Sequence, residues 1–326
     1  MIATVPSDPL GRFIAIASEL AAHKRWWEGP TLVRYAALPL VLAPGAPAAL
    51  AERVDCEGGA LVKEQGWFSD LRGGMRFFVA GWLVASGRVP SGFTSACEAI
   101  RERLRAASVR RGGAYEVVAI TMLHVAGGGD ETTVQRLQQI YEMMRRHHWW
   151  LTGPDDLPAC ALLALRGGDV PGIEARVEGV YERLRQHGIS AGSGLQMASH
   201  IACLVPASEA DVVQRFVALH SGFKANGVQM WDSDLDEIAL LCLLDQDAET
   251  TVRTVLDHRA ELKAKLRVSG PTVDFSLACG TAFLAAHAGV DLDRRLSLDI
   301  ELANFAMAAN AARIHEAAKQ ASHGAS

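Results

Sequence analysis

The 326-residue sequence lacks several common features, and each shortage argues against a class of protein. Aromatic residues make up only 6%, which is low for a β-sandwich or β-barrel. The formal net charge is −5, so the chain lacks the dense positive surface that nucleic-acid binding requires. No uninterrupted apolar run reaches the ~18 residues of a membrane-spanning helix. We therefore expect a globular protein with no nucleic-acid partner and no membrane span.

The six cysteines form no Cys-x-x-Cys pair, which argues against the common cysteine-based zinc sites. Cys160 and Cys242 lie within apolar runs, as expected for small buried side chains in a reducing compartment. The first residues show no basic segment followed by an apolar core, so we predict no signal peptide. Together these observations predict a cytoplasmic protein.

The clearest pattern that is present is an internal repeat of about 40 residues. Seven short apolar segments can each be aligned on one alanine. These anchors are Ala37, Ala80, Ala119, Ala159, Ala198, Ala239 and Ala278. A nearly constant period held over seven units is typical of helical-repeat proteins.

Longer amphipathic stretches separate the apolar segments, for example 131–147, 172–187 and 210–225. Their apolar residues follow the i, i+3, i+4, i+7 spacing of a helix with one buried face. Each unit is therefore predicted to be an αα-hairpin with one buried and one amphipathic helix. Such hairpins can stack into an open solenoid or close into an α/α toroid around a central cavity. The apolar character of the buried helices favours a toroid or a strongly curved solenoid.

This all-α reading predicts one helical-repeat domain over residues 1–326, with the repeats spanning about 10–295. Leu302 and Phe305 belong to a further helical pattern at about 296–318, which we interpret as a capping helix. Residues 319–326 are expected to form a disordered tail.

Two segments resemble an uncharacterised bacterial family, domain of unknown function 4003. They are LTGPDDLPACALLAL at 151–165 and ISAGSGLQMASHIACL at 189–204, and the turn Gly66-Trp67-Phe68 also matches. The resemblance spans roughly residues 10–300. It implies an all-α protein of about this length and carries no activity with it.

Charged residues recur three or four positions before the anchors, where the buried helices are expected to begin. They are Arg34, Arg76, Glu116, Asp155, Asp156, Asp236 and Asp274, with Tyr115 at the same level. Equivalent positions of stacked repeats lie at one level, so we expect these side chains near one rim. The simplest interpretation of each aspartate is capping of a helix N-terminus.

The adjacent pair Asp155 and Asp156 is the sharpest chemical candidate. Burial and mutual repulsion at the mouth of a buried helix can raise the pKa of one carboxyl, which suits a general acid. The pair weakly resembles the Asp-x-Asp-Asp motif of class II terpene cyclases, which are α/α toroids. Here Gly153 stands in place of the first aspartate of that motif. Asp236, at the same level of a later repeat, is a further candidate acid.

A second acidic run contains Asp232 and Asp234. Alternating carboxylates can hold Mg²⁺, although the glycine and distal glutamate of a calcium loop are absent. The alternative is a polar turn that caps a helix. No other cofactor is expected.

Trp149, Trp150 and Trp231 recur near the turns between hairpins, where they either staple neighbouring hairpins or line the rim of a pocket. Gln196 and His200 lie within a buried helix, where each is either satisfied in the core or lines a cavity.

These candidates support two functional interpretations. In the first, a small hydrophobic molecule, such as an isoprenoid, binds in the central cavity. Arg34, Arg76, Tyr115 and Glu116 then join the tryptophans, Gln196 and His200 as ligand-contacting residues, and the aspartates at the mouth support acid-initiated cyclase or lyase chemistry. The alternative is a non-catalytic scaffold that binds a protein partner on an open concave surface. The oligomeric state does not follow from the sequence.

Overall fold

The computed structural model describes residues 4–26, 28–64, 71, 73–88, 92–109, 112–147, 152–268 and 270–324. Within these residues the chain is all α-helical, and its only β feature is an isolated bridge between Thr4 and Asp291. The prediction of an all-α helical-repeat fold is confirmed. None of the described helices has both the length and the apolar character needed to cross a membrane.

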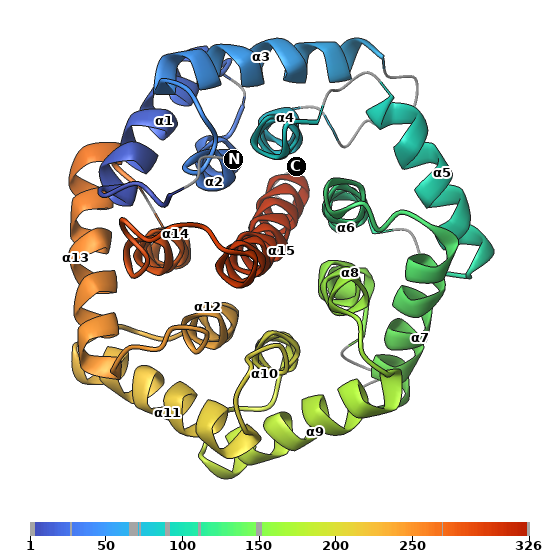
Figure 1. Cartoon of the computed structure of the whole chain (residues 1–326), viewed down its shortest axis with the longest axis vertical. Helices are drawn as coiled ribbons and strands as arrows, with labels where there is room; N and C mark the ends of the chain where they lie inside the picture. Colours follow the sequence, from blue (N-terminus) through green and yellow to red (C-terminus); the bar gives the residue numbers. More distant parts are fainter. Residues whose placement is uncertain are drawn as a thin grey trace.

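The helices alternate along the chain between an outer and an inner layer (Figure 1). The outer helices are α1 (Pro9–His23), α3 (Pro47–Lys63), α5 (Phe93–Ala106), α7 (Glu131–His147), α9 (Val170–Gln186), α11 (Glu209–Ala225) and α13 (Ala248–Leu266). The inner helices are α2 (Pro30–Leu40), α4 (Gly74–Ser86), α6 (Ala114–Ala126), α8 (Leu157–Arg166), α10 (Ser193–Ala202), α12 (Leu235–Leu241) and α14 (Pro271–Ala285). Short 3-10 turns, η2 (Pro154–Asp156) and η3 (Asp232–Asp234), precede α8 and α12.

The small residues that define the repeat lie where the inner helices pack most closely. All seven anchor alanines fall in inner helices, and each is at most 1% exposed. Close packing is clearest between α2 and α4, where a Cβ on Gly81 would lie only 2.8 Å from the backbone oxygen of Ala36. The 40-residue period therefore marks the positions that let neighbouring inner helices approach.

The outer helices are fastened to the inner layer by arginines that recur in the repeat. Arg12 donates from Nε to the carbonyl of Val41, and Arg176 does the same to Cys203, both at 2.8 Å. These carbonyls lie just past the C-terminal ends of α2 and α10, where backbone acceptors have no partner within the helix. Each such arginine thus caps one inner helix from its outer neighbour.

The first and last repeats lie side by side. Helix α1 contacts both α13 and α14, so the pairs form a ring in Figure 1. The N-terminal segment also bonds to the connection after α14, because Val5 donates to Val290 and Gly289 donates to Val5.

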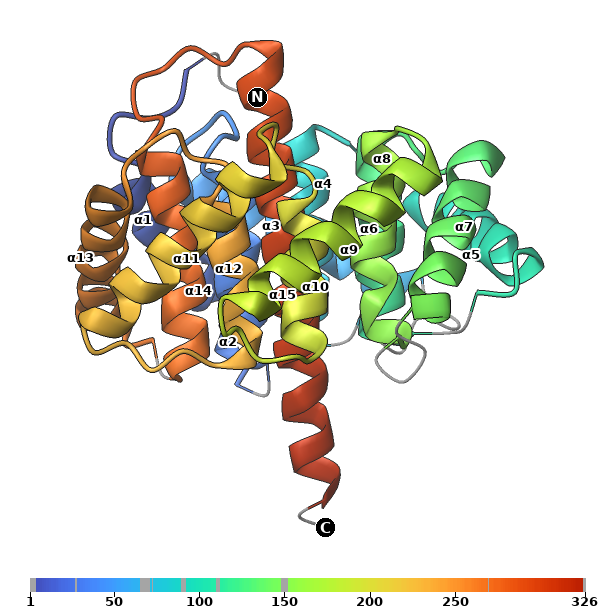
Figure 2. The same cartoon turned by 90° about the horizontal axis from the view of Figure 1, so that it is seen from below.

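Helix α15 (Arg294–Gly324) passes through the centre of this ring, and its C-terminal turns project beyond it (Figures 1 and 2). This helix differs in length and place from the expected capping helix at about 296–318 and the expected disordered tail at 319–326. The reason is that apolar residues lie all around this helix. The consecutive residues Ala306, Met307, Ala308 and Ala309 are all buried and point to different sides, and a helix buried on every side needs neighbours on every side.

Candidate functional site

A cluster of polar side chains, all buried except the partly buried Arg313, surrounds α15 near the N-terminal ends of the inner helices. Its members come from α2, α12, α14 and α15. They are Tyr35, Asp236, Glu237, Ser276, Asn310 and Arg313, and we call them the axial polar cluster.

Two residues of α15 make the contacts that join this cluster. Arg313 forms an ion pair with Asp236 of α12. Asn310 donates from its amide to Glu237 and also to the Ser276 hydroxyl, the latter at 3.0 Å. The polar residues of α15 therefore face carboxylates and a hydroxyl from two inner helices, which fixes the rotation of α15 about its own axis.

Burial controls the protonation of the two carboxyl groups. It raises the pKa of both Asp236 and Glu237, while the positive charge of Arg313 opposes the rise in each. The charge of Asp236 adds to the rise at Glu237. The pKa of Glu237 is therefore raised by burial and by a neighbouring charge together, whereas Asp236 has a direct cationic partner in Arg313.

Several atoms of the cluster make no well-formed hydrogen bond among the described residues, although Ser276 interacts with both Tyr35 and Glu237. These atoms are Tyr35 Oη, Asp236 Oδ1, Glu237 Oε2 and Asn310 Oδ1. Burial raises the pKa of the Tyr35 phenol, so its hydroxyl keeps a proton that it can donate. The arrangement can bind a small polar group, and it resembles sites that hold internal water in other proteins.

The predicted pair Asp155–Asp156 lies at the start of α8, on η2. Asp156 is 4% exposed, accepts a hydrogen bond from the Gly153 amide at 2.9 Å, and lies 3.4 Å from the Gln196 amide nitrogen. Burial and the neighbouring charge of Asp155 raise the pKa of Asp156 to about 8. The pKa of Asp155, which is only partly buried, is also raised by burial. The Asp156 carboxyl thus caps η2, and its environment raises its pKa.

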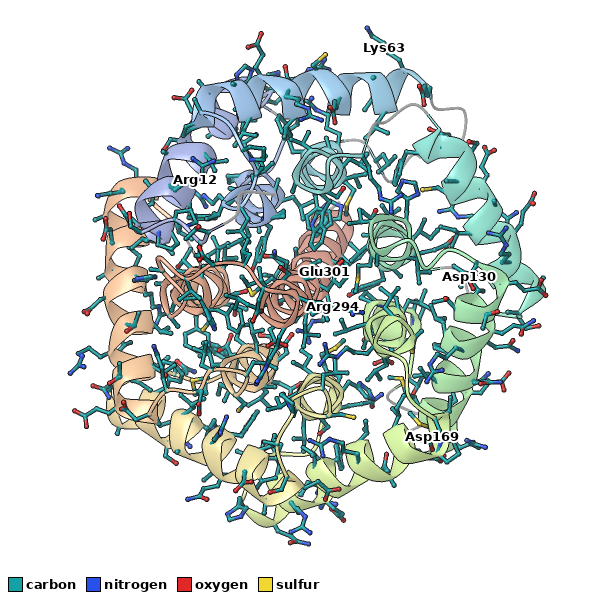
Figure 3. The ribbon with its side chains drawn as sticks, viewed as in Figure 1. Arg12, Lys63, Asp130, Asp169, Arg294 and Glu301 are labelled. Carbon is teal, nitrogen blue, oxygen red and sulfur yellow. The ribbon has the colours of Figure 1, made fainter. Side chains whose placement is uncertain are left out.

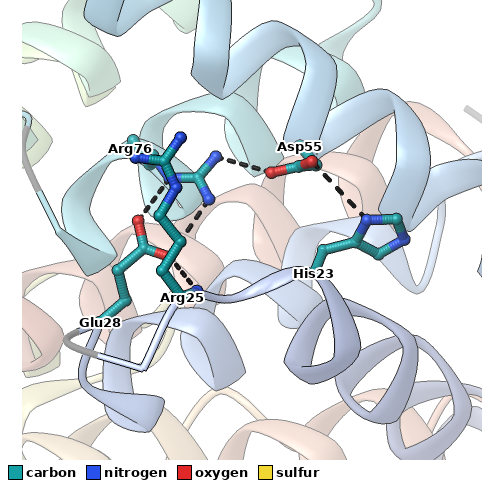
Figure 4. Close-up of polar contacts among 5 residues, drawn as sticks. All are labelled: His23, Arg25, Glu28, Asp55 and Arg76. Carbon is teal, nitrogen blue, oxygen red and sulfur yellow. Dashed lines mark hydrogen bonds and ion pairs between the residues drawn. The ribbon is translucent and has the colours of Figure 1, made fainter.

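Four other charged residues of the same level point the opposite way, toward the outer layer. Arg76 forms ion pairs with Glu28 at 2.6 Å and Asp55 at 2.7 Å (Figure 4). Its guanidinium joins the α1–α2 connection to α3, and Arg25 donates its backbone amide to the same Glu28. This network belongs to the packing of the two layers.

Three more side chains also point toward the outer layer: Glu116, Asp274 and Arg34. Glu116 pairs with Arg101 of α5, and Asp274 pairs with Arg259 of α13 at 2.7 Å. Arg34 donates to the last carbonyl of α13 at 2.8 Å. An anchor alignment fixes the level of a residue but not the direction of its side chain: Glu116 and Asp236 both stand three positions before their anchors, yet Glu116 pairs with α5 and Asp236 with α15. The expected single acidic rim is therefore divided into an outward and an inward set.

Asp232 and Asp234 both accept hydrogen bonds from backbone amides. Asp232 Oδ2 lies 2.7 Å from the Gly194 amide at the start of α10, and Asp234 Oδ2 lies 2.9 Å from the Trp231 amide. Among the described residues, no group of three or more His, Cys, Asp or Glu side chains is placed to hold a metal. The capping alternative describes these contacts, and the magnesium role stays a prediction.

The remaining candidates are divided between the interior and the surface. Gln196 and His200 are each 1% exposed within α10, whereas the Trp231 side chain is 45% exposed. Burial raises the pKa of Tyr115 to about 12, and Asp155 adds to the rise. The structure does not describe Trp149, Trp150 or the turn Gly66-Trp67-Phe68.

A pocket that the sequence analysis missed lies at the opposite end of the ring axis. It has a volume of about 360 Å³, and most of its wall is apolar. It lies between the first turns of α15 and the C-terminal ends of α2, α4 and α6. Its main lining residues are Pro39, Leu42, Trp82, Val125, Leu298 and Glu301. We call it the apolar pocket.

Two polar groups belong to this apolar wall. The Trp82 ring stacks on Phe305 of α15 with centroids 4.9 Å apart, and its indole Nε1–H has no acceptor among the described residues. Glu301 lies near the centre of the ring in Figure 3, and burial raises its pKa. Arg294, two turns earlier on α15, lies at the rim.

The comparisons with known proteins give one match. The model of a protein family of unknown function, DUF4003, matches residues 52–288. No curated protein and no solved structure matches the chain. The match agrees with the family resemblance in the sequence, and the comparisons add no support for the likeness to terpene cyclases.

Proposed function

This chain belongs to the DUF4003 family of proteins of unknown function, and we propose that it binds a small hydrophobic molecule in the apolar pocket. The observation that carries the proposal is the pocket itself. Its volume of about 360 Å³ lies within the range of small-molecule sites, which are mostly apolar with a few polar groups. Glu301 and Asn304 are polar groups of this kind.

The ligand is hydrophobic, as the sequence suggests, but we place it in the apolar pocket and not in a central cavity. The axis that a central cavity would occupy is filled by α15, and Asp156 and Asp236 lie at the level of Arg313. Asn304 lines the pocket nine residues before Arg313, which is about 13 Å along a helix. The aspartates therefore do not reach a ligand in this pocket, and we propose binding without acid-initiated chemistry.

The scaffold alternative requires an open concave surface on the inner helices. Helix α15 contacts α2, α6, α8, α12 and α14 along that surface. A protein partner would first have to displace a helix held by an ion pair and two hydrogen bonds. We therefore favour the small ligand.

Binding can be tested on the full chain with N-phenyl-1-naphthylamine, a neutral probe whose fluorescence rises in apolar sites. We expect saturable binding with a dissociation constant on the order of micromolar. Ala85 lines the pocket and is only partly buried, so Ala85→Phe should fill the pocket and abolish binding.

Ala175 offers a matched control, because it is exposed on α9, far along the chain from the pocket. Ala175→Phe should bind the probe like the unmodified protein. The proposal is wrong if the unmodified protein shows no saturable binding, or if both phenylalanine variants bind equally well.

A further inference from the structure

We propose that the ligand of the apolar pocket carries a protonated primary amine on a hydrophobic chain, and that Glu301 of α15 pairs with this ammonium group. The inference rests on the proposed function and adds the chemical class of the ligand. It follows from the way in which polar and apolar side chains are divided between the two sides of the pocket.

One side of the pocket is a column of polar side chains on α15. Arg294, Ser297, Glu301 and Asn304 all line the pocket. They stand three or four positions apart, so they share one face of the helix, with about 5–6 Å between the Cβ atoms of neighbouring members. The opposite side, from α2, α4 and α6, is mostly apolar. A hydrophobic molecule in the pocket therefore meets a polar edge along α15.

The side chains of this polar column have no partners within the part of the chain that the structure describes. None of the four makes a hydrogen bond or an ion pair there through its side chain, whereas Asn310, Arg313 and Glu316 in the other half of α15 each have a partner. Ser297 and Asn304 are only partly buried, as is Glu301, and their polar atoms keep accessible surface. A ligand in the pocket can therefore reach them.

Glu301 sets the sign of the charge that the column accepts. It is the acidic residue among the described residues that line the pocket. Burial raises its pKa, and no described cation offsets the rise. A partly desolvated carboxylate without a partner is unfavourable, so a ligand that brings a cation is stabilised by a charge-assisted hydrogen bond.

Arg294 opposes a cationic ligand only weakly. It precedes Glu301 by seven residues, which is about 10.5 Å along the helix. The Arg294 side chain is exposed at the rim, where solvent and salt screen its charge over about 8–10 Å. The charge next to a ligand group at Glu301 is therefore the carboxylate.

A primary ammonium group matches the acceptors of the column. It has three N–H donors and no acceptor. One donor pairs with Glu301, and the oxygens of Ser297 and Asn304, one turn away on either side, are acceptors for another. A hydroxyl group forms no ion pair, a carboxylate places a like charge beside Glu301, and a trimethylammonium group has no N–H to donate. These contacts favour the primary amine.

The experiment measures displacement of N-phenyl-1-naphthylamine from the full chain by four ligands with the same ten-carbon chain. They are decylamine, decyltrimethylammonium, 1-decanol and decanoic acid. At neutral pH decylamine is protonated, because primary amines of this kind titrate near pH 10, about as lysine does. We expect decylamine to bind about tenfold more tightly than each of the others.

Substitutions at Glu301 test the role of its charge. Glu301→Gln keeps the size and removes the charge, so decylamine should bind about tenfold more weakly, while the affinity for 1-decanol changes less than about twofold. Glu301→Asp keeps the charge and should retain part of the preference for decylamine. Glu182→Gln, exposed on α9, is the control and should leave all four affinities unchanged. Circular-dichroism melting curves establish that each variant is folded.

The outcomes distinguish the two proposals. Equal binding of decylamine and 1-decanol to the unmodified protein overturns the amine inference while hydrophobic binding stands, and so does an unchanged preference for decylamine in Glu301→Gln. Equal binding of decyltrimethylammonium overturns the assignment to a primary amine. Preference for decanoic acid overturns the inference and assigns recognition to Arg294. If neither the probe nor any of the four ligands binds, the proposed function itself fails.

Discussion

The two halves of α15 are buried in opposite ways. Around Leu298, Glu301 and Phe305, the helix meets mostly apolar side chains and leaves room for the apolar pocket. Around Asn310 and Arg313, it meets carboxylates and a hydroxyl through directed contacts of the axial polar cluster. One continuous helix is therefore loosely packed at one end and held by directed polar contacts at the other.

The difference shows how a helix can be fixed in a ring without closing a ligand site. Apolar contacts have no preferred direction, so they tolerate a gap and small shifts of the helix. Hydrogen bonds and ion pairs require defined angles and distances, so Asn310 and Arg313 set the rotation and height of α15. The polar half then holds the position of Glu301 in the apolar half.

The largest effect is expected from breaking the polar half. Arg313→Met leaves the Asp236 carboxylate buried without its cation, and we expect a loss of about 3–5 kcal/mol in the free energy of unfolding. Urea denaturation followed by circular dichroism measures it.

Two further variants test this reading of the polar half. Arg295→Met should change stability by less than about 0.5 kcal/mol, because the Arg295 side chain is 80% exposed. Adding Asp236→Leu to Arg313→Met should recover part of the loss. A double variant no more stable than Arg313→Met alone would contradict the view that an uncompensated charge causes the loss.

A smaller effect is expected in the apolar half. Phe305→Ala removes the stacking partner of Trp82 and should cost about 3 kcal/mol, the lower end for a buried phenylalanine because the adjacent pocket lets the site relax. Phe305→Leu should cost about 1 kcal/mol in the same denaturation experiment. Equal costs for the two variants would show that side-chain volume at this position is unimportant.

The last effect concerns pH and is spread over several pH units. The pKa of Asp156 is raised to about 8, so the folded protein binds a proton that the unfolded chain releases near pH 4. Its contribution to stability is therefore complete below about pH 4 and is lost as the pH rises toward 8. Asp156→Asn mimics the neutral carboxyl and should flatten the profile by up to about 1.4 kcal/mol per pH unit in this range.

Melting temperatures between pH 5 and 8 check this expectation. Asp232→Asn is the control, because Asp232 is exposed and accepts from a backbone amide. Equal slopes for the unmodified protein and Asp156→Asn would contradict a protonated Asp156.

The repeat made much of the fold predictable. The 40-residue period and the apolar spacing identify which helices are inner and outer, because burial dictates residue type strongly. The period does not predict the direction in which each side chain points from its helix. Glu116 and Asp236 occupy the same place relative to their anchors, yet one faces α5 and the other faces α15.

The sequence pattern also does not predict that α15 lies at the centre of the ring. The spacing of Leu302 and Phe305 is typical of any helix with a buried face, whether it caps an array or fills a ring. The apolar pocket exists only because α15 meets the ends of α2, α4 and α6, so no single segment signals it. Arg313 and Asn310, in a segment interpreted as a cap, were missed for the same reason.

The central place of α15 also bears on how the protein is made. All seven helix pairs precede it in the chain, so the ribosome produces the wall of the ring before its centre. At about 5–20 residues per second, the 31 residues of α15 take roughly 2–6 seconds to synthesise. Until then the apolar inner faces lack their final partner, so a nascent chain passes through a stage suited to chaperone binding, and the ligand pocket is the last part to be completed.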